Sequence, residues 1–169
     1  MQCHNFNEDW TFVQADQADR LKAFYGNSNA VAVTLPHDAM IREKRDKDCP
    51  SGAQSGFYPG GVYTYEKKFM AQNEWKKQDV FLEFEGIYGI ARVWINGSLA
   101  AVNRNGYMGF SVDLKLWISY EHENIIRIDV DNSKQPNSRW YSGSGIYRDV
   151  NLWTGKDVYI SHDKLRITT

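Results

Sequence analysis

The sequence predicts an all-β fold, a jelly-roll β-sandwich with only short helical pieces. Three observations support this class. No apolar stripe with helical spacing lasts longer than a turn or two, whereas short runs of β-branched and aromatic residues, each ended by turn residues, recur along the chain. Asn96-Gly97 between two such runs is the dipeptide preferred in a type I′ hairpin turn. A hydrophobic content of 42% is enough for a packed core.

The expected strands alternate in character, as strands do when one side of a sheet is buried. Ile126, Ile128 and Val130, for example, share one face of their strand. With about ten strands and no Cys…Trp…Cys pattern, a jelly roll is favoured over an immunoglobulin sandwich. In chain order the expected strands are Val31–Leu35, Val62–Phe69, Val80–Glu85, Ala91–Ile95, Leu99–Val102, Gly109–Val112, Ile125–Val130, Val150–Trp153, Val158–Ile160 and Leu165–Thr168.

Helix is expected only in short pieces, at Asp16–Phe24, around Asp38–Arg42 and at Leu114–Ser119. The region Arg42–Gly61 opens with a mixed charge run and continues through Pro and Gly, and a run of this length without periodicity is typical of a mobile or functional loop. The chain has no internal repeat and no sign of a second domain. Residues 1–169 are therefore expected to form one domain.

Charge and composition exclude several function classes. The chain has 20 Lys and Arg against 21 Asp and Glu, which argues against nucleic acid or an anionic membrane as a partner held by bulk charge. No apolar run approaches the roughly 20 residues that span a bilayer. The start of the chain is polar and shows no signal peptide, so a cytoplasmic location is expected. Cys3 and Cys49 lack metal-ligand spacing and are expected to be free thiols.

No residue is identified as catalytic, and no metal ligands or cofactor are expected in this chain. Glycoside hydrolysis requires two carboxyl groups either about 5–5.5 Å or about 6.5–9.5 Å apart, but Glu83 and Glu85 are better explained as the solvent-exposed face of a strand. Gly143-Ser144-Gly145, with the adjacent Ser142, does not match a nucleophile-elbow motif. The four histidines lack the spacing of zinc ligands. His37-Asp38 could pair, although a hydrogen bond that fixes a loop is the more common outcome.

The segment Arg139–Val150 is the most informative stretch, because it combines two arginines, three aromatic residues and two glycines. Aromatic rings offer flat apolar faces, and arginine offers forked donors to oxygen. Such a loop suits a polar ligand with a C–H face, of which sugars are the commonest. Aromatic residues that simply pack inward explain the same composition equally well, so the residues alone leave both interpretations open.

An ordered set of motifs favours the ligand interpretation. The chain resembles the N-terminal sugar-binding domain of glycoside hydrolase family 2, and the form of Arg139–Arg148 is most similar to the β-galactosidase branch. Each motif alone is weak, but together they cover nearly the whole chain. The matching motifs are Phe6–Phe12, Leu35–Ala39, Gly61–Phe69, Phe84–Tyr88, Ala91–Gly97, Gly106-Tyr107 with Phe110, Asp129–Asn132 and Arg139–Val150.

The resemblance implies a galactose-binding-like sandwich that accompanies an immunoglobulin-like domain and a catalytic TIM barrel, neither of which is expected in this chain. The family's catalytic glutamates belong to the barrel, so the chain by itself is expected to be inactive. Its partners would be that barrel and a carbohydrate, expected to be a β-galactoside. The residues expected to line the sugar pocket or face the barrel are Arg139, Trp140, Tyr141, Tyr147, Arg148 and Tyr58.

One departure from the family pattern concerns Arg139. In some β-galactosidases an acidic residue at this position contacts galactose and a monovalent cation, so the arginine argues against both contacts here. Two other functions are consistent with the same residues. The chain could be an autonomous carbohydrate-binding module or lectin, or a purely structural domain for assembly. In either sugar-binding case Trp140 and Tyr141 would be used, and the segment Arg139–Val150 is expected to be among the more exposed or mobile.

Overall fold

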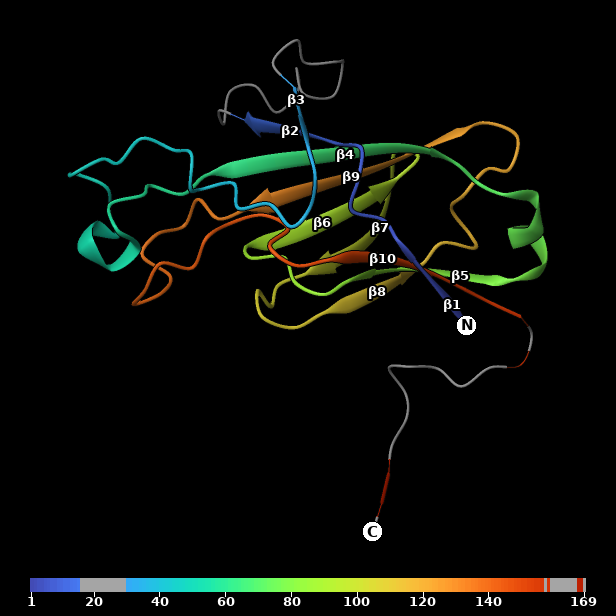
Figure 1. Ribbon diagram of the computed structural model, residues 1–169. Helices are drawn as coiled ribbons and strands as arrows, with labels where there is room; N and C mark the ends of the chain where they lie inside the picture. The colour runs from blue at the N-terminus through green and yellow to red at the C-terminus, as the bar shows by residue number, and fades with distance from the viewer. Residues whose placement is uncertain (16–29, 157, 159–166, 169) are drawn as a thin grey trace.

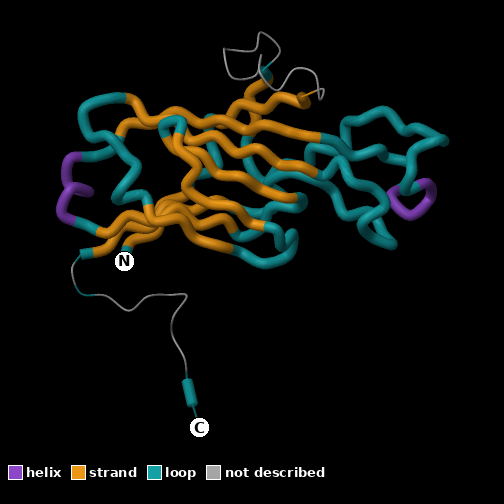
Figure 2. The backbone as a smooth tube through the Cα atoms, turned by 180° about the vertical axis from the view of Figure 1, so that it is seen from behind, coloured by secondary structure: helices purple, strands orange, loops and turns teal. Residues whose placement is uncertain are grey.

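The computed structural model describes residues 1–15, 30–156, 158 and 167–168. Two antiparallel sheets lie face to face, and long loops extend from one end of the sandwich (Figures 1 and 2). The predicted all-β, galactose-binding-domain-like sandwich is confirmed. Among the described residues, helix is limited to two short 3₁₀ turns, and none is long and apolar enough to cross a membrane.

The two sheets differ in size, and the chain passes between them repeatedly. The smaller sheet has the order β1 (Gln2–Asn5), β10 (Val150–Gly155), β5 (Asp79–Phe84) and β8 (Phe110–Asp113). The larger sheet has the order β3 (Val31–Val33), β2 (Trp10–Ala15), β4 (Val62–Met70), β9 (Glu123–Asp131), β6 (Ile90–Ile95) and β7 (Ser98–Asn103). In each sheet the two edge strands are far apart in the sequence. Both sheets therefore depend on pairing between strands that are distant in the chain.

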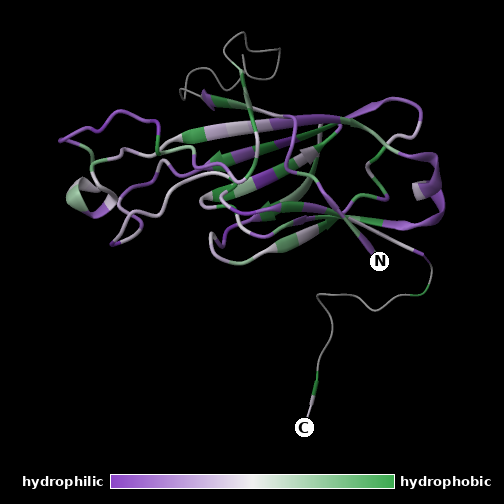
Figure 3. Ribbon diagram, viewed as in Figure 1, coloured by the Kyte–Doolittle hydropathy of each residue, from purple (hydrophilic) through white to green (hydrophobic). Residues whose placement is uncertain are grey.

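The core lies between the sheets and is built by strand alternation. Leu82 and Phe84 of β5 are fully buried and face Ile126 and Ile128 of the larger sheet across one apolar layer. Apolar and polar residues accordingly alternate along the arrows in Figure 3. Burying a side chain of this size is worth about 1.5–3 kcal/mol, so this layer supplies the main stabilisation of the sandwich.

The eight strands expected between residues 31 and 153 are all present, with ends shifted by at most two residues. The hairpin at Asn96-Gly97 is also confirmed, because both residues have positive φ, 49° and 82°. The strands expected at Val158–Ile160 and Leu165–Thr168 fall largely outside the described residues, and their described members are not in strands.

Two strands were not predicted. β1 consists of polar, exposed residues at the edge of its sheet, so it carries no alternation and is held by backbone pairing with β10. β2 begins at the buried Trp10, within a family motif for which no strand was predicted.

The expected helix around Asp38–Arg42 is wrong, because the Asp38 side chain accepts the Met40 N–H and forms a turn instead. The expected helix at Leu114–Ser119 is reduced to one turn, in which the Leu114 carbonyl accepts two N–H groups. The piece expected at Asp16–Phe24 lies outside the described residues. The two 3₁₀ helices present, η3 (Gly52–Ser55) and η4 (Asn73–Lys77), were not expected.

Candidate functional site

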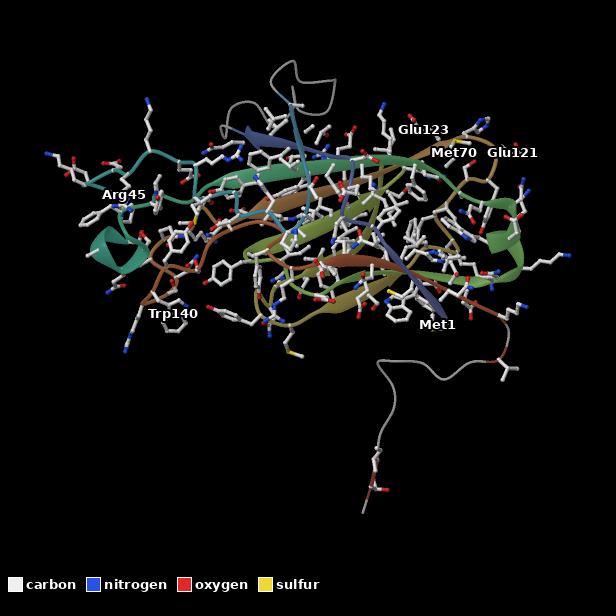
Figure 4. All side chains as sticks on the ribbon, viewed as in Figure 1. Met1, Arg45, Met70, Glu121, Glu123 and Trp140 are labelled. Atoms are coloured by element: carbon white, nitrogen blue, oxygen red, sulfur yellow. The ribbon has the colours of Figure 1, made fainter. Side chains whose placement is uncertain are left out.

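Three loops meet at one end of the sandwich: residues 34–61, 104–109 and 132–149. Figure 4 shows Arg45 and Trp140 at this end, whereas Met70, Glu121 and Glu123 mark the opposite end. Hydrogen bonds join the loops in pairs, from Tyr141 to Asp38 and from Trp140 to Tyr107. The segment singled out by composition therefore sits where the other two long loops converge.

The middle of that segment, residues 143–146, is buried and paired with the loop that follows β3. The His37 N–H donates to the Ile146 carbonyl at 2.8 Å, and the Ala39 N–H donates to the Ser144 carbonyl at 2.8 Å. Ile146 and Ser144 are both fully buried. The expectation that the whole segment is exposed is wrong for this part, because its backbone groups need these partners once they leave water.

Gly145 stands at the tightest point of the buried part. Its N–H and carbonyl exchange hydrogen bonds with Tyr88 at 3.1 and 2.9 Å. A Cβ at this position would lie 2.1 Å from the Tyr65 hydroxyl, and φ is +94°. Only glycine satisfies both conditions, which explains why the segment has a glycine here.

Asp38 connects the buried part of the segment to its exposed part. One carboxylate oxygen accepts the N–H groups of Met40 and Ser144, each at 3.0 Å, and the other accepts the Tyr141 hydroxyl at 2.6 Å. A Cβ on Gly143 would lie 3.0 Å from the second oxygen, so the glycine leaves room for the carboxylate. Burial, and then the Asp38 charge, raise the pKa of Tyr141, which keeps its hydroxyl a donor.

His37 and Asp38, which the sequence suggested as a pair, have different partners. The His37 ring nitrogen Nδ1 lies 2.9 Å from the Tyr65 hydroxyl. Burial, followed by the charge of Arg42, lowers the pKa of His37, so a neutral ring is favoured. These contacts fix the loop and form no acid–base pair.

Asn132 is a second anchor of the segment, and the sequence analysis did not identify it as a site residue. The amide is almost fully buried, and its nitrogen donates to the Ser144 hydroxyl. Its oxygen accepts from the Asn137 amide at 2.6 Å. Asn132 thereby joins both ends of the loop that carries Trp140, and its sequence signals are its place directly after a strand-ending Asp and in the motif Asp129–Asn132.

The exposed part of the segment comprises Arg139, Trp140 and Tyr141. Trp140 is 58% exposed, and its indole N–H donates to the Tyr107 hydroxyl at 3.1 Å. Tyr141 is tilted against Tyr58 with ring centroids 5.4 Å apart. Arg139 is exposed and has no hydrogen bond or ion pair with any residue the structure describes. Four of the expected site residues are thus brought to one end of the molecule.

Tyr147 and Arg148, the other two expected site residues, follow the buried part of the segment. The Tyr147 hydroxyl donates to the Gly106 carbonyl at 2.9 Å, and its ring occupies the space that a Cβ on Gly86 would need. Arg148 is exposed, and its guanidinium carbon lies 5.6 Å from the centre of the Tyr147 ring. Tyr147 therefore bridges two loops, and its hydroxyl is already engaged.

Glu43 is another carboxylate at this end, and its environment is unusual. One oxygen accepts the Tyr63 hydroxyl at 2.5 Å and the Gln14 amide at 2.9 Å. The other oxygen is buried and has no partner at hydrogen-bond distance and angle among the described residues. Burial raises the pKa of Glu43, although the Tyr63 hydrogen bond opposes the shift. In the described part of the chain no three His, Cys, Asp or Glu side chains gather as a metal site would require.

The fold and the convergence of its long loops at one end define a galactose-binding-domain-like sandwich. The chain belongs to the family described as glycosyl hydrolase 2 galactose-binding domain-like, whose model matches residues 10–157. The predicted resemblance to glycoside hydrolase family 2 is therefore confirmed. This chain is a domain of the kind found in those enzymes.

Known relatives agree with this assignment. The chain is 38% identical to the β-galactosidase BoGH2A of Bacteroides ovatus, over 90% of the chain and 18% of that protein. It is 31% identical to a putative β-glucuronidase of Formosa agariphila, over 88% of the chain and 14% of that protein. A β-glycosidase structure from Bacteroides vulgatus superposes with a TM-score of 0.82 at 36% identity, covering 91% of this chain and 20% of the other. The chain thus spans about a fifth of the length of these relatives.

Proposed function

We propose that this chain is a non-catalytic domain that helps to shape the sugar pocket of a family 2 glycosidase, most simply a β-galactosidase. Its partners would be a β-galactoside and a catalytic TIM-barrel domain of the same protein. The similarity to the Bacteroides ovatus β-galactosidase supports the galactoside, whereas the similarity to a β-glucuronidase leaves a uronide as the main competitor. No cofactor is proposed.

The observation that carries this proposal is the contrast within one loop. Trp140 and Tyr141 stand exposed beside a buried base, and Asp38 links the two parts by accepting the Tyr141 hydroxyl and the Ser144 N–H. Exposed aromatic rings on a fixed base cost little conformational entropy when they meet a ligand or another domain. A surface of this kind is suited to form one wall of a pocket.

The bonding of two carboxylates at this end, Asp38 and Glu43, supports a non-catalytic role. Asp38 already accepts three donors, and Glu43 accepts the Tyr63 hydroxyl and the Gln14 amide. A glycosidase needs one carboxylic acid and one carboxylate flanking the bond to be broken, each free to exchange protons or bond with the sugar. Carboxylates that already accept hydrogen bonds from the loops are poor candidates for that chemistry. We assign it to the catalytic domain.

A direct test is to incubate the 169-residue chain with a chromogenic β-galactoside and a chromogenic β-glucuronide. Turnover no higher than that of a mock purification is expected. Turnover above that level, abolished by Asp38→Asn or Glu43→Gln, would contradict the non-catalytic role.

The pocket-shaping role is tested in a chimera. The chain replaces the matching segment of the Bacteroides ovatus β-galactosidase, with which it is 38% identical. The chimera is expected to hydrolyse galactosides, and Trp140→Ala within it is expected to reduce kcat/KM about tenfold or more, as loss of a sugar-stacking ring does. Lys76→Ala, at the opposite end of the sandwich, is the matched control. A Trp140→Ala chimera with unchanged kinetics would instead support a purely structural domain.

The exposed Trp140 also favours a second candidate function, an autonomous lectin. The two functions differ in what the isolated chain binds. Titration with galactose and lactose by calorimetry or NMR distinguishes them. A pocket-shaping domain contributes only one wall, so affinity weaker than millimolar is expected for these neutral sugars, whereas sub-millimolar binding would favour the lectin.

A further inference from the structure

A cavity distinct from the exposed tip opens between the 104–109 loop and the start of the 132–149 loop. Its volume is about 460 Å³, within the range of about 300–1,000 Å³ typical of small-molecule sites. Trp140 stands beside it through the hydrogen bond to Tyr107. The lining residues that can contact a ligand through polar or aromatic groups are Tyr88, Arg104, Asn105, Tyr107, Lys134 and Asn137.

The charges of this cavity are unbalanced. Arg104 and Lys134 both line it, both are exposed, and neither forms an ion pair or hydrogen bond through its side chain within the described ranges of the chain. The lining also contains one acid, Asp131, one of whose oxygens accepts both the N–H and the hydroxyl of Ser133, so two cations stand against one anion. Two cations that lack partners among the described residues favour an anionic ligand at this cavity, and the forked donors of a guanidinium match the two oxygens of a carboxylate.

The remaining walls suit a sugar ring. Tyr88 and Tyr107 meet edge to face with centroids 5.4 Å apart, and Tyr107 is 55% exposed, so part of its apolar ring is available. Gly106 packs directly against the Tyr88 ring. A Cβ on Gly106 would come within 2.7 Å of that ring, so a larger residue would not fit here. The Asn105 amide nitrogen adds a donor for a hydroxyl, while its oxygen accepts the Tyr107 N–H; the Asn137 amide is engaged by Asn132 and the Lys134 carbonyl and helps to hold the wall in place.

We propose that this cavity is a binding site for an acidic saccharide unit, a uronic acid. Arg104 and Lys134 receive its carboxylate, and Tyr107 packs against its ring. The residues invoked for this site all belong to this chain. The site therefore stands independently of the pocket-shaping role, which concerns the tip formed by Arg139, Trp140 and Tyr141.

The test uses the 169-residue chain, titrated by NMR with methyl galacturonoside, methyl glucuronoside and methyl galactoside. A uronoside is expected to bind at least fivefold more tightly than the neutral galactoside and to shift the resonances of residues 104–107 and 134–137. Equal binding of neutral and acidic sugars, or no binding of either uronoside, would overturn the proposal. Tighter binding of galactose 6-sulfate than of both uronosides would overturn the assignment to a carboxylate.

Variants locate the site. Arg104→Gln and Lys134→Gln are each expected to weaken uronoside binding roughly three- to tenfold, the range for charge-assisted contacts that remain partly open to solvent. Lys47→Gln, an exposed cation of the 34–61 loop outside the cavity, is the matched control and is expected to leave binding unchanged. An equal loss in all three variants would show that net charge alone attracts the ligand, and would contradict a specific site. Because all three side chains are exposed, thermal melting is expected to confirm unchanged folding.

Discussion

The segment between β9 and β10 contains two parts that differ in almost every physical respect. Residues 139–141 are exposed and carry large side chains, whereas residues 143–146 are buried and rich in glycine. The buried part exchanges backbone hydrogen bonds with His37, Ala39 and Tyr88. The exposed part is connected to the rest of the protein mainly through the hydroxyl of Tyr141 and the indole of Trp140. One loop thus separates the residues that hold it from those available for contact, and the two parts should respond differently to substitution.

The largest effect is expected at Gly145. Gly145→Ala places a Cβ against the Tyr65 hydroxyl at positive φ, so we expect a loss of about 4 kcal/mol in the free energy of unfolding, or failure to fold. Gly97→Ala is the control, because that glycine also has positive φ but no atom within 4 Å of the added Cβ. It should cost only about 1 kcal/mol in urea denaturation. Similar losses of stability in the two variants would mean that the positive φ alone, and not the close packing against Tyr65, requires glycine at position 145.

Asp38→Ala is expected to have the next largest effect. The change removes the acceptor of three donors and should lower the free energy of unfolding by about 3 kcal/mol. Tyr141→Phe removes only the bond to the exposed part, so we expect a loss below about 1 kcal/mol. A Tyr141→Phe loss as large as that of Asp38→Ala would show that the exposed part also holds the loop.

Glu43→Gln should stabilise the protein, and the effect should depend on pH. A carboxyl group whose pKa is raised on folding stabilises the folded state below its unfolded pKa, and this contribution is lost as pH rises through the folded pKa. At pH 7 the variant, which cannot ionise, should therefore be the more stable protein, by less than about 1 kcal/mol because Glu43 is partly exposed. Near pH 3.5 the difference in the free energy of unfolding between the variant and the parent chain should shrink toward zero. Urea denaturation at both pH values provides the measurement, and an unchanged difference would contradict the raised pKa.

Trp140→Ala is expected to have the smallest effect on stability. The ring is mostly exposed, so a change within about 0.5 kcal/mol is expected, even though the hydrogen bond to Tyr107 is lost. Differential scanning calorimetry should find nearly the same Tm as in the parent chain. A clear drop in Tm would place Trp140 with the residues that hold the loop, and would weaken its assignment to a pocket wall.

Much of the fold could be predicted from the sequence because strand alternation is a local signal. β9 and β5 alternate so regularly that their buried faces follow directly from residue type. β1 could not be found in this way, since its residues are polar and its position is set by pairing with β10, about 150 residues away in the chain. Tertiary pairing, not propensity, decides such edge strands.

The candidate site was predicted less completely, for a related reason. Composition located the segment but could not divide it into a buried and an exposed part, because its anchors are distant. Asp38 lies more than 100 residues upstream of Tyr141, and its role appears only when the loops meet. Asn132 resembles an ordinary turn residue in sequence, yet its amide is buried against Ser144. The glycines were noticed, but the atoms that require them belong to Tyr65 and Asp38.

The position of β10 has a consequence for biosynthesis. β10 lies between β1 and β5, so the smaller sheet lacks an inner strand until residue 155 has left the ribosome. The segment that carries Trp140 directly precedes β10. Its hydrogen bonds to the other loops are therefore expected to form at the same stage of synthesis. Nascent chains stalled with only residues 1–140 exposed should accordingly remain sensitive to protease, whereas chains exposed to residue 155 should become resistant. The sandwich and its candidate site would then form in one late step, so that no partly emerged chain presents the aromatic loop in its final shape.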